Sequence, residues 1–403
     1  MSWKKVFLGS LYELPSRNGL TRPSKVRGVG YKMVNMGELF ANEWLYDIPM
    51  ERVQLNDREK RECLIAKNDL LFARQSLVAS GAGKCSIVRE VKEPTTFESH
   101  LIRVRLDTTK AVPLFYYYYF KSPLSPMKTI VTICAQAGIR GSDLATLSVE
   151  CPDLPTQRRI ASILSAYDDL IENNRRQIKL LEEAAQRLYR EWFVELRFPG
   201  HEGVKVVDGV PEGWKKQKLV DIADVQYGFA FDGKCFNNQR SGTPIIRIRN
   251  IPDGTTSDYT TESADSRYVV HNGEIVVGMD GEFHINTWNG EDAYLVQRTC
   301  CIRPTDKALN GWLLYAIYEP IKFYEKTVVG STVAHLGKKH VDTIELLTSP
   351  SNLYKPFVAT VYKGNIIKNL IMDCQSYTKY RPNETTGGIF VSWRRKEELP
   401  TGA

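Results

Sequence analysis

The sequence predicts an α+β protein in which two similar globular domains are separated by long helices that form an antiparallel coiled coil. Three observations support this prediction. A long stretch in the middle of the chain has the apolar spacing of a coiled-coil helix, similar landmarks occur in the same order on either side of it, and a second helical stretch follows the second set of landmarks. We therefore expect domains at residues 1–153 and 199–348, the central helix at 154–198, and a second helix with a tail at 349–403.

The central helix is predicted by core-type residues that recur in alternating steps of four and three. These seam positions are Ile160, Leu164, Tyr167, Ile171, Asn174, Ile178, Leu181, Ala185, Leu188 and Trp192. A repeat of about 3.5 residues is typical of a coiled coil, because it keeps one stripe of the helix facing its partner. Asn174 is the single polar member, and a polar residue at such a seam fixes the partner and the register. At about 1.5 Å per residue the helix would be roughly 55 Å long, which suits a rigid spacer.

The first domain is predicted to consist of short strands bounded by turns. β-rich runs lie between Gly, Asn-Asp and Pro residues at 26–36, 69–72, 85–88 and 101–106. The run LFYYYYFK, residues 114–121, is apolar enough to be a buried helix or a strand. Its tyrosines could stack on nucleic-acid bases, but we favour a packed core element with its hydroxyl groups at the rim.

The second domain is predicted to repeat this layout, with strand-like runs at 244–251, 274–278 and 293–303. Short motifs recur at an offset of 197 residues: Lys307-Ala308 corresponds to Lys110-Ala111, and Pro320 corresponds to Pro123. We also align Gly330 with Gly138, an offset of 192 residues, and Arg249-Asn250-Ile251 with Val34-Asn35-Met36. The order of these matches indicates one α+β domain used twice with diverged surfaces.

A second helix is predicted at residues 352–379, with apolar anchors at Phe357, Val361, Ile367, Leu370 and Cys374. Gly364 interrupts the stretch and Pro382 ends it. We expect this helix to pair antiparallel with the central one. The alternative is a plain C-terminal helix that packs on the second domain.

Composition and charge exclude several classes of protein. Of 403 residues, 42% are hydrophobic and 25% are charged, and the formal net charge of +7 permits nucleic-acid binding without establishing it. The eight cysteines form no CxxC pair, which argues against a disulfide framework or a metal site. No apolar run approaches the ~18 residues that span a bilayer, and the first residues lack the apolar core of a signal peptide. We expect a cytoplasmic protein with no membrane association.

No catalytic motif is complete. Residues 80–85, SGAGKC, resemble the end of a phosphate-binding loop, but Val78 replaces its first glycine and Cys85 replaces the Ser or Thr that would hold magnesium. The chain has no Pro-Pro dipeptide, which amino-methyltransferases use to grip the target amine, and no Glu-x-Lys follows Pro152-Asp153 as in a metal-dependent nuclease. Gly-x-Ser-x-Gly and His-Glu-x-x-His are also absent. We expect no catalytic residue and no metal ligand.

The stretch LPTQRRIASILSAYDDLIENNRRQIKLLEEAAQRLYREWF, residues 154–193, resembles the central conserved region of the specificity subunit of type I restriction-modification enzymes. Shorter stretches resemble parts of its target-recognition domains: NDLLFAR at 68–74, RFPGH at 197–201, VPEGW at 210–214 and GEIVVGMDG at 273–281. The C-terminal residues 378–403 depart from the family pattern, which puts the full length of the second helix in doubt.

The resemblance implies a non-catalytic subunit. Each target-recognition domain would read one half of a bipartite sequence in double-stranded DNA, while the helices set the gap between the halves and dock two modification subunits. Those subunits would bind S-adenosylmethionine, and restriction subunits would bind ATP and Mg²⁺, so that this chain itself would bind no cofactor.

The candidate DNA contacts lie in polar, basic loops bounded by turns, as expected of residues that read base edges. They are Arg74, Gln75, Ser80, Lys84, Arg140, Ser142, Arg247, Arg249, Asn250, Met279, Asp280, His284, Asn286, Ser331, Thr332, Lys338 and Lys339. Two alternatives remain open. One is a standalone DNA methyltransferase or nuclease with embedded specificity domains, and the other is a coiled-coil scaffold that does not bind DNA.

Overall fold

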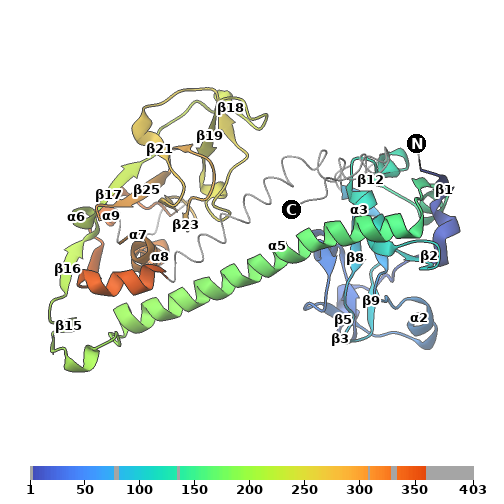
Figure 1. The fold of residues 1–403 in the computed structure, drawn as a ribbon, viewed down its shortest axis with the longest axis horizontal. Helices are drawn as coiled ribbons and strands as arrows, with labels where there is room; N and C mark the ends of the chain where they lie inside the picture. Colours follow the sequence, from blue (N-terminus) through green and yellow to red (C-terminus); the bar gives the residue numbers. More distant parts are fainter. Residues whose placement is uncertain (1–2, 77–80, 134–136, 307–308, 328–333, 360–403) are drawn as a thin grey trace. The chain divides into compact units, whose positions relative to one another are not determined.

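The computed structural model describes residues 3–76, 81–133, 137–306, 309–327 and 334–359. They fall into two compact units, the first up to Leu170 and the second from Ile171. The boundary lies within α5 (Leu154–Tyr189), a continuous helix of 36 residues (Figure 1).

The first unit mixes short helices with strands. Its helices are α1 (Met36–Ala41), α2 (Asp57–Glu62), α3 (Pro113–Lys121) and α4 (Gly141–Thr146). Its strands are β1 (Lys5–Phe7), β2 (Tyr12–Asn18), β3 (Arg27–Val34), β4 (Trp44–Leu45), β5 (Glu51–Val53), β6 (Leu70–Ala73), β7 (Gln75–Ser76), β8 (Cys85–Val88), β9 (Thr95–Phe97), β10 (Leu101–Leu106), β11 (Thr132–Ile133), β12 (Ala137–Gly138) and β13 (Ser148–Glu150). The predicted runs 85–88 and 101–106 are thus confirmed as β8 and β10.

The main sheet of the first unit has the order β2-β10-β6-β8-β4, and apolar residues cover both of its faces. Along β6, Leu70 and Phe72 enter the core that contains α3, whereas Leu71 and Ala73 enter a smaller core. A strand buried on both faces needs apolar residues at every position, which explains the unbroken run LLFA.

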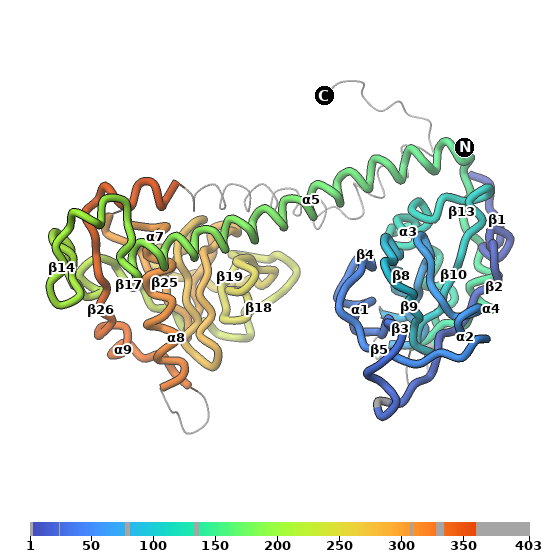
Figure 2. Tube along the Cα trace, turned by 90° about the horizontal axis from the view of Figure 1, so that it is seen from below, coloured from blue at the N-terminus to red at the C-terminus, as the bar shows by residue number. Residues whose placement is uncertain are grey.

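The LFYYYYFK run forms α3, which packs against β8 (Figure 2). Tyr116 and Tyr117 are fully buried, and the Tyr116 hydroxyl donates to the Glu150 carbonyl at 3.1 Å. The core interpretation is therefore confirmed, because these rings have no free face on which a base could stack.

The second unit repeats this arrangement. Its helices are α6 (Leu219–Ile222), α7 (Asn310–Ala316), α8 (Tyr318–Thr327) and α9 (Lys338–Asp342). Its strands are β14 (Val206–Val207), β15 (Val210–Pro211), β16 (Lys215–Lys218), β17 (Ala223–Tyr227), β18 (Phe236–Asn237), β19 (Thr243–Ile246), β20 (Tyr259–Thr260), β21 (Val269–Val270), β22 (Ile275–Gly278), β23 (Ile285–Thr287), β24 (Ala293–Leu295), β25 (Thr299–Pro304) and β26 (Glu345–Thr348). Its sheet β17-β25-β22-β23 corresponds to β2-β10-β6-β8, with the same antiparallel pairing of the central strands.

An equivalent ion pair occurs at the same place in both units, with a fully buried carboxylate in the first unit and a partly buried one in the second. In the first, the Asp69 carboxylate accepts hydrogen bonds from Arg105 Nε and Nη2 at 2.7 and 2.8 Å. In the second, Glu274 accepts from Arg303 Nε and Nη2 at 2.7 and 2.9 Å. Each acidic residue immediately precedes a central strand, β6 or β22, and each arginine lies on the neighbouring strand, β10 or β25. The two ion pairs therefore hold equivalent positions in the repeated sheet.

The alignment of Gly330 with Gly138 is wrong. Gly138 pairs with Gln75 in the first unit, and the equivalent bridge in the second unit joins His335 to Asp280. Gly138 therefore corresponds to His335, at the same offset of 197 residues that separates the starts of α4 and α9, Gly141 and Lys338. Gly330 itself lies outside the described residues.

Two strand predictions in the second unit are also corrected. The run 293–303 is not one strand but two, β24 and β25, because the chain turns between them and Arg298 takes a φ of +70°. The run 244–251 is extended only to Ile246, and a 3₁₀ turn, Ile248–Asn250, follows.

Helix α5 is anchored in a core at each end. Near its start, Ile160 and Leu164 are buried beside α3, and the Tyr118 hydroxyl donates to Asp168 at 2.9 Å. Burial raises the pKa of Asp168. Near its end, Ala185 and Phe193 enter the core of the second unit, and the helix finishes in a π-helical turn, Arg190–Val194, before reaching the predicted end at 198.

The seam positions differ in their exposure. Ile160, Leu164 and Ala185 are buried and Tyr167 is 56% exposed, whereas the partly buried members are Ile171, Asn174, Ile178, Leu181, Leu188 and Trp192. Residues 351–359 are helical, and Phe357 is buried. The remaining anchors of the second helix, from Val361 onwards, lie outside the described residues, so the antiparallel pairing stays a prediction.

Candidate nucleic-acid interface

In the first unit, two predicted loops that are distant in sequence meet at one edge. β7 pairs with β12, with Gln75 opposite Gly138. The Ile139 amide also donates to the Arg74 carbonyl at 2.9 Å. This pairing brings Arg74 and Gln75 next to the segment that leads into α4. We call this set of loops, residues 74–76, 98–100 and 137–142, the first loop cluster.

The side chains of the first loop cluster are mostly polar and accessible. Arg140 precedes α4 and is exposed, and Ser142 is exposed in its first turn. Arg74 Nη1 donates to the Ser99 carbonyl at 3.3 Å. The Lys84 backbone pairs with Ala73, directly before Arg74, but its side chain is directed to α1, where Nζ donates to the Phe40 carbonyl at 2.9 Å. Ser80 is outside the described residues.

The second unit forms the equivalent second loop cluster from residues 279–281, 296–298 and 334–339. The Leu336 amide donates to the Met279 carbonyl at 2.8 Å, as Ile139 does to Arg74 in the first unit. Lys338 and Lys339 open α9 and are exposed. Met279 itself is 5% exposed and belongs to the core, so its side chain is not available to a ligand at the surface.

A polar triad of Asp280, Arg298 and His335 occupies the second loop cluster. The Asp280 carboxylate accepts a hydrogen bond from Arg298 Nη1 at 2.8 Å and lies 2.5 Å from His335 Nδ1. The side chains of Arg298 and His335 are 57% and 49% exposed, whereas that of Asp280 is 24% exposed. Of these three residues, the sequence predicted only Asp280.

The other predicted contacts of the second unit lie around the 3₁₀ turn Ile248–Asn250. Arg249 forms two hydrogen bonds with Asp258, at 2.6 and 3.1 Å, and Asn250 donates to the same carboxylate at 3.2 Å. The Arg247 guanidinium lies over the Phe236 ring, 5.4 Å from its centre.

Two further predicted residues follow β22. Asn286 Nδ2 donates to the carbonyls of Ile251 and Pro252, at 3.0 and 2.9 Å. Its amide group therefore stabilises the loop at these two residues rather than facing outwards. His284 lies 3.6 Å from Glu282. Ser331 and Thr332 lie outside the described residues.

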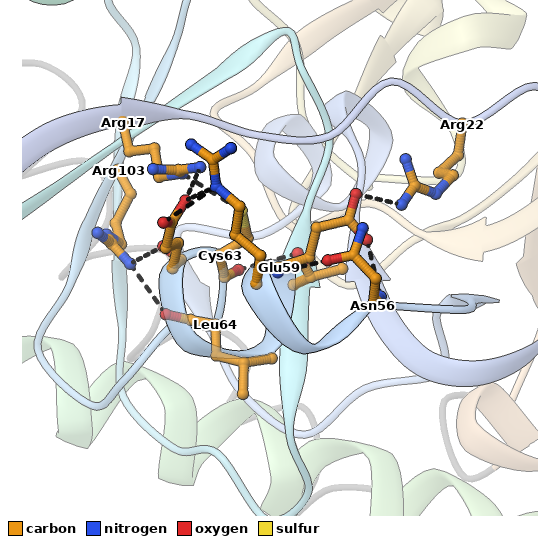
Figure 3. A network of polar contacts seen from close by, with 10 residues as sticks. Arg17, Arg22, Asn56, Glu59, Cys63, Leu64 and Arg103 are labelled. Carbon is orange, nitrogen blue, oxygen red and sulfur yellow. Dashed lines mark hydrogen bonds and ion pairs between the residues drawn. The ribbon is translucent and has the colours of Figure 1, made fainter.

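Three arginines elsewhere in the first unit are already engaged within the protein. Arg17 donates to Glu62 at 2.5 Å and Arg22 to Glu59 at 2.6 Å, while Arg103 donates to the Leu64 carbonyl at 3.0 Å (Figure 3). The arginines hold α2 in place. Because two of them are paired with carboxylates, they do not form a free basic patch.

Comparison with known proteins decides the family. The model of the type I restriction modification DNA specificity domain matches residues 1–183 and 211–351. The chain belongs to this family. The two matched stretches also confirm the predicted internal repeat.

Relatives of this specificity-domain chain include the type I restriction enzyme MjaIX specificity subunit of Methanocaldococcus jannaschii, 22% identical over 361 residues that cover 85% of this chain and 82% of the relative. The type I restriction enzyme EcoBI specificity subunit of Escherichia coli is 32% identical over 131 residues, which cover 32% of this chain and 28% of that one. The crystal structure of the type I restriction-modification system S subunit from M. genitalium has the same fold, with a TM-score of 0.53 and 14% identity over 98% of this chain and 95% of that one.

No metal site or membrane helix accompanies these specificity domains within the described ranges. No group of His, Cys, Asp and Glu side chains there could hold a metal ion. No helix in the same ranges is long and apolar enough to cross a bilayer.

Proposed function

We propose that this chain is the DNA-recognition subunit of a type I restriction-modification system, without catalytic activity of its own, and that each unit reads one half of a bipartite duplex target. The observation that supports this proposal is that the two units share one scaffold but carry different residues in their loop clusters. The ion pairs of Asp69 and Glu274 are equivalent, yet Gln75 and Gly138 in one loop cluster are replaced by Asp280 and His335 in the other. Two copies of one scaffold with different loop chemistry suit two different base sequences.

Helix α5 is the proposed spacer between the two half-sites. Ile160 of this helix lies in the core of the first unit and Ala185 in the core of the second, and the helix is continuous between them. A helix rises about 1.5 Å per residue, so its length limits which half-site separations one chain can bridge. We propose that the seam from Ile160 to Trp192 pairs with the helical segment beginning near residue 351, as an antiparallel coiled coil.

The partners follow from the same proposal. Two modification subunits would dock on the helices and carry S-adenosylmethionine, and restriction subunits would carry ATP and Mg²⁺. This chain would bind double-stranded DNA and none of those cofactors.

Selection of bound DNA from random duplex pools tests the proposed function. The full chain, alone and with its modification subunits, should enrich a split sequence with a fixed gap. Retention of no DNA, or enrichment of one continuous motif only, would contradict the proposal. The pure chain should also transfer no labelled methyl group to the enriched DNA in the absence of modification subunits.

Lys338 and Lys339 are expected to contact phosphates rather than bases. They are exposed lysines at the start of α9, and lysine neutralises phosphate without reading sequence. The double variant Lys338→Ala, Lys339→Ala should weaken binding about equally for all sequences. It should also reduce the slope of log affinity against log salt concentration by about two.

The control for this variant replaces Lys215 and Lys216, two exposed lysines of β16, with alanine. This pair should leave both affinity and salt slope unchanged. A changed base preference in the Lys338→Ala, Lys339→Ala variant would show that these lysines read sequence instead.

A further inference from the structure

We infer that Arg298 reads a guanine in the half-site bound by the second unit, with Asp280 holding its guanidinium in position. The inference rests on the proposed function and adds to it a residue and a base. It starts from the polar triad of the second loop cluster.

The guanidinium of Arg298 has one edge engaged and one edge available. Nη1 donates to Asp280 at 2.8 Å. Among the described residues, Nε and Nη2 have no hydrogen-bond acceptor, and the side chain is 57% exposed. These two donors are parallel and adjacent, which matches the O6 and N7 acceptors of guanine in the major groove.

The surroundings of Arg298 favour a base edge over a phosphate. The Asp280 carboxylate beside the guanidinium would repel a phosphate oxygen, whereas the guanine edge carries no net charge. Asp280 is itself fixed, because its other oxygen lies 2.5 Å from His335 Nδ1 and its side chain is only 24% exposed. A guanidinium held in this way loses less rotational freedom on binding than a free arginine.

The backbone at Arg298 is a second, independent observation. Its φ of +70° lies in the left-handed region, which is strained for a residue with a side chain. The strain is placed at the turn that carries the guanidinium to the surface, where Thr299 N donates to the Val296 carbonyl at 3.2 Å. Strained residues of this kind cluster at binding sites.

The first unit has a turn with the equivalent hydrogen bonds, but its residue at the position of Arg298 does not take a positive φ. The Leu101 amide donates to the Glu98 carbonyl at 3.0 Å, and the Arg74 amide donates to the carbonyl of His100, as Met279 does to Arg298. His100 therefore occupies the position of Arg298. The side chain at this position varies while the hydrogen bonds of the turn are retained, as expected of a residue that determines which base is read.

The test is enrichment from random duplex pools by the full chain and three single variants, Arg298→Gln, Arg298→Lys and Arg267→Gln. The wild-type chain should enrich a split motif with a guanine at one position of one half. Arg298→Gln should lose the preference at that position alone and bind the wild-type motif about ten- to a hundredfold more weakly. Arg298→Lys keeps the charge but not the parallel donors, so it should recover only part of the preference.

Arg267→Gln is the matched control, because Arg267 is an exposed arginine of the same unit that lies 3.9 Å from an aspartate, Asp265. It should leave the motif unchanged. His100→Ala, at the equivalent position of the first unit, should alter the other half of the motif only.

The outcomes separate the two proposals. A wild-type split motif that Arg298→Gln leaves intact overturns the guanine assignment alone. Uniform weakening with a lower salt slope also overturns it, since that result identifies a phosphate contact. Failure of the wild-type chain to enrich any split motif overturns the proposed function, and the assignment with it.

Discussion

Replacing Arg105 with methionine is expected to lower the free energy of unfolding of the first unit by about 3–5 kcal/mol. Its partner Asp69 has a fully buried side chain, so the variant leaves a carboxylate without its cation in a site that water does not reach. The loss should appear as faster hydrogen exchange of the β6 and β10 amides, because these strands carry the two residues or adjoin them.

The matched control is Arg303→Met in the second unit. Glu274 makes the same two hydrogen bonds, but its side chain is 21% exposed, so part of its charge can be hydrated after the arginine is removed. Its effect should be smaller and confined to the second unit. Equal losses in the two variants, or unchanged exchange in β6, would contradict the assignment of Asp69 as the more deeply buried partner.

Inserting four helix-forming residues after Arg176 is expected to change the gap between the half-sites. Arg175, Arg176 and Gln177 are exposed in the middle of α5, so the insertion leaves the cores at either end intact. Four residues lengthen a helix by roughly 6 Å, which is at most about two base pairs at 3.4 Å each. Binding to the original target should fall sharply, and duplex pools should yield the same two half-sites with a longer gap.

The control places the same four residues after Gly209, in the exposed turn between β14 and β15. This insertion adds equal length outside α5 and should leave the gap unchanged. If the α5 insertion also kept the original gap, the helix would not be the spacer.

Features governed by local pattern were predicted well from the sequence. β8 and β10 have the predicted bounds, because short apolar runs between turn residues leave little freedom in where a strand begins and ends. The burial of Tyr116 and Tyr117 also followed from their neighbours, since the seven core-type residues of LFYYYYF leave no polar face to expose.

The loop clusters were predicted less well, because they depend on pairing between distant segments. Arg298 and His335 were missed: no local signal marks a left-handed turn at an arginine or a bridge across 55 residues. Met279 was predicted as a loop residue, but it continues the pattern of β22, in which every second side chain points into the core, and it is buried with Ile275 and Val277. Composition alone does not distinguish a residue just inside a strand end from one just outside it.

The uninterrupted course of α5 through both units has an evolutionary consequence. A genetic crossover in its exposed middle, around Arg175, would exchange everything downstream without cutting through either hydrophobic core. A hybrid gene formed there would encode two intact bodies from different parents. New combinations of DNA preferences could then arise in one recombination event, with no need for the loops to mutate.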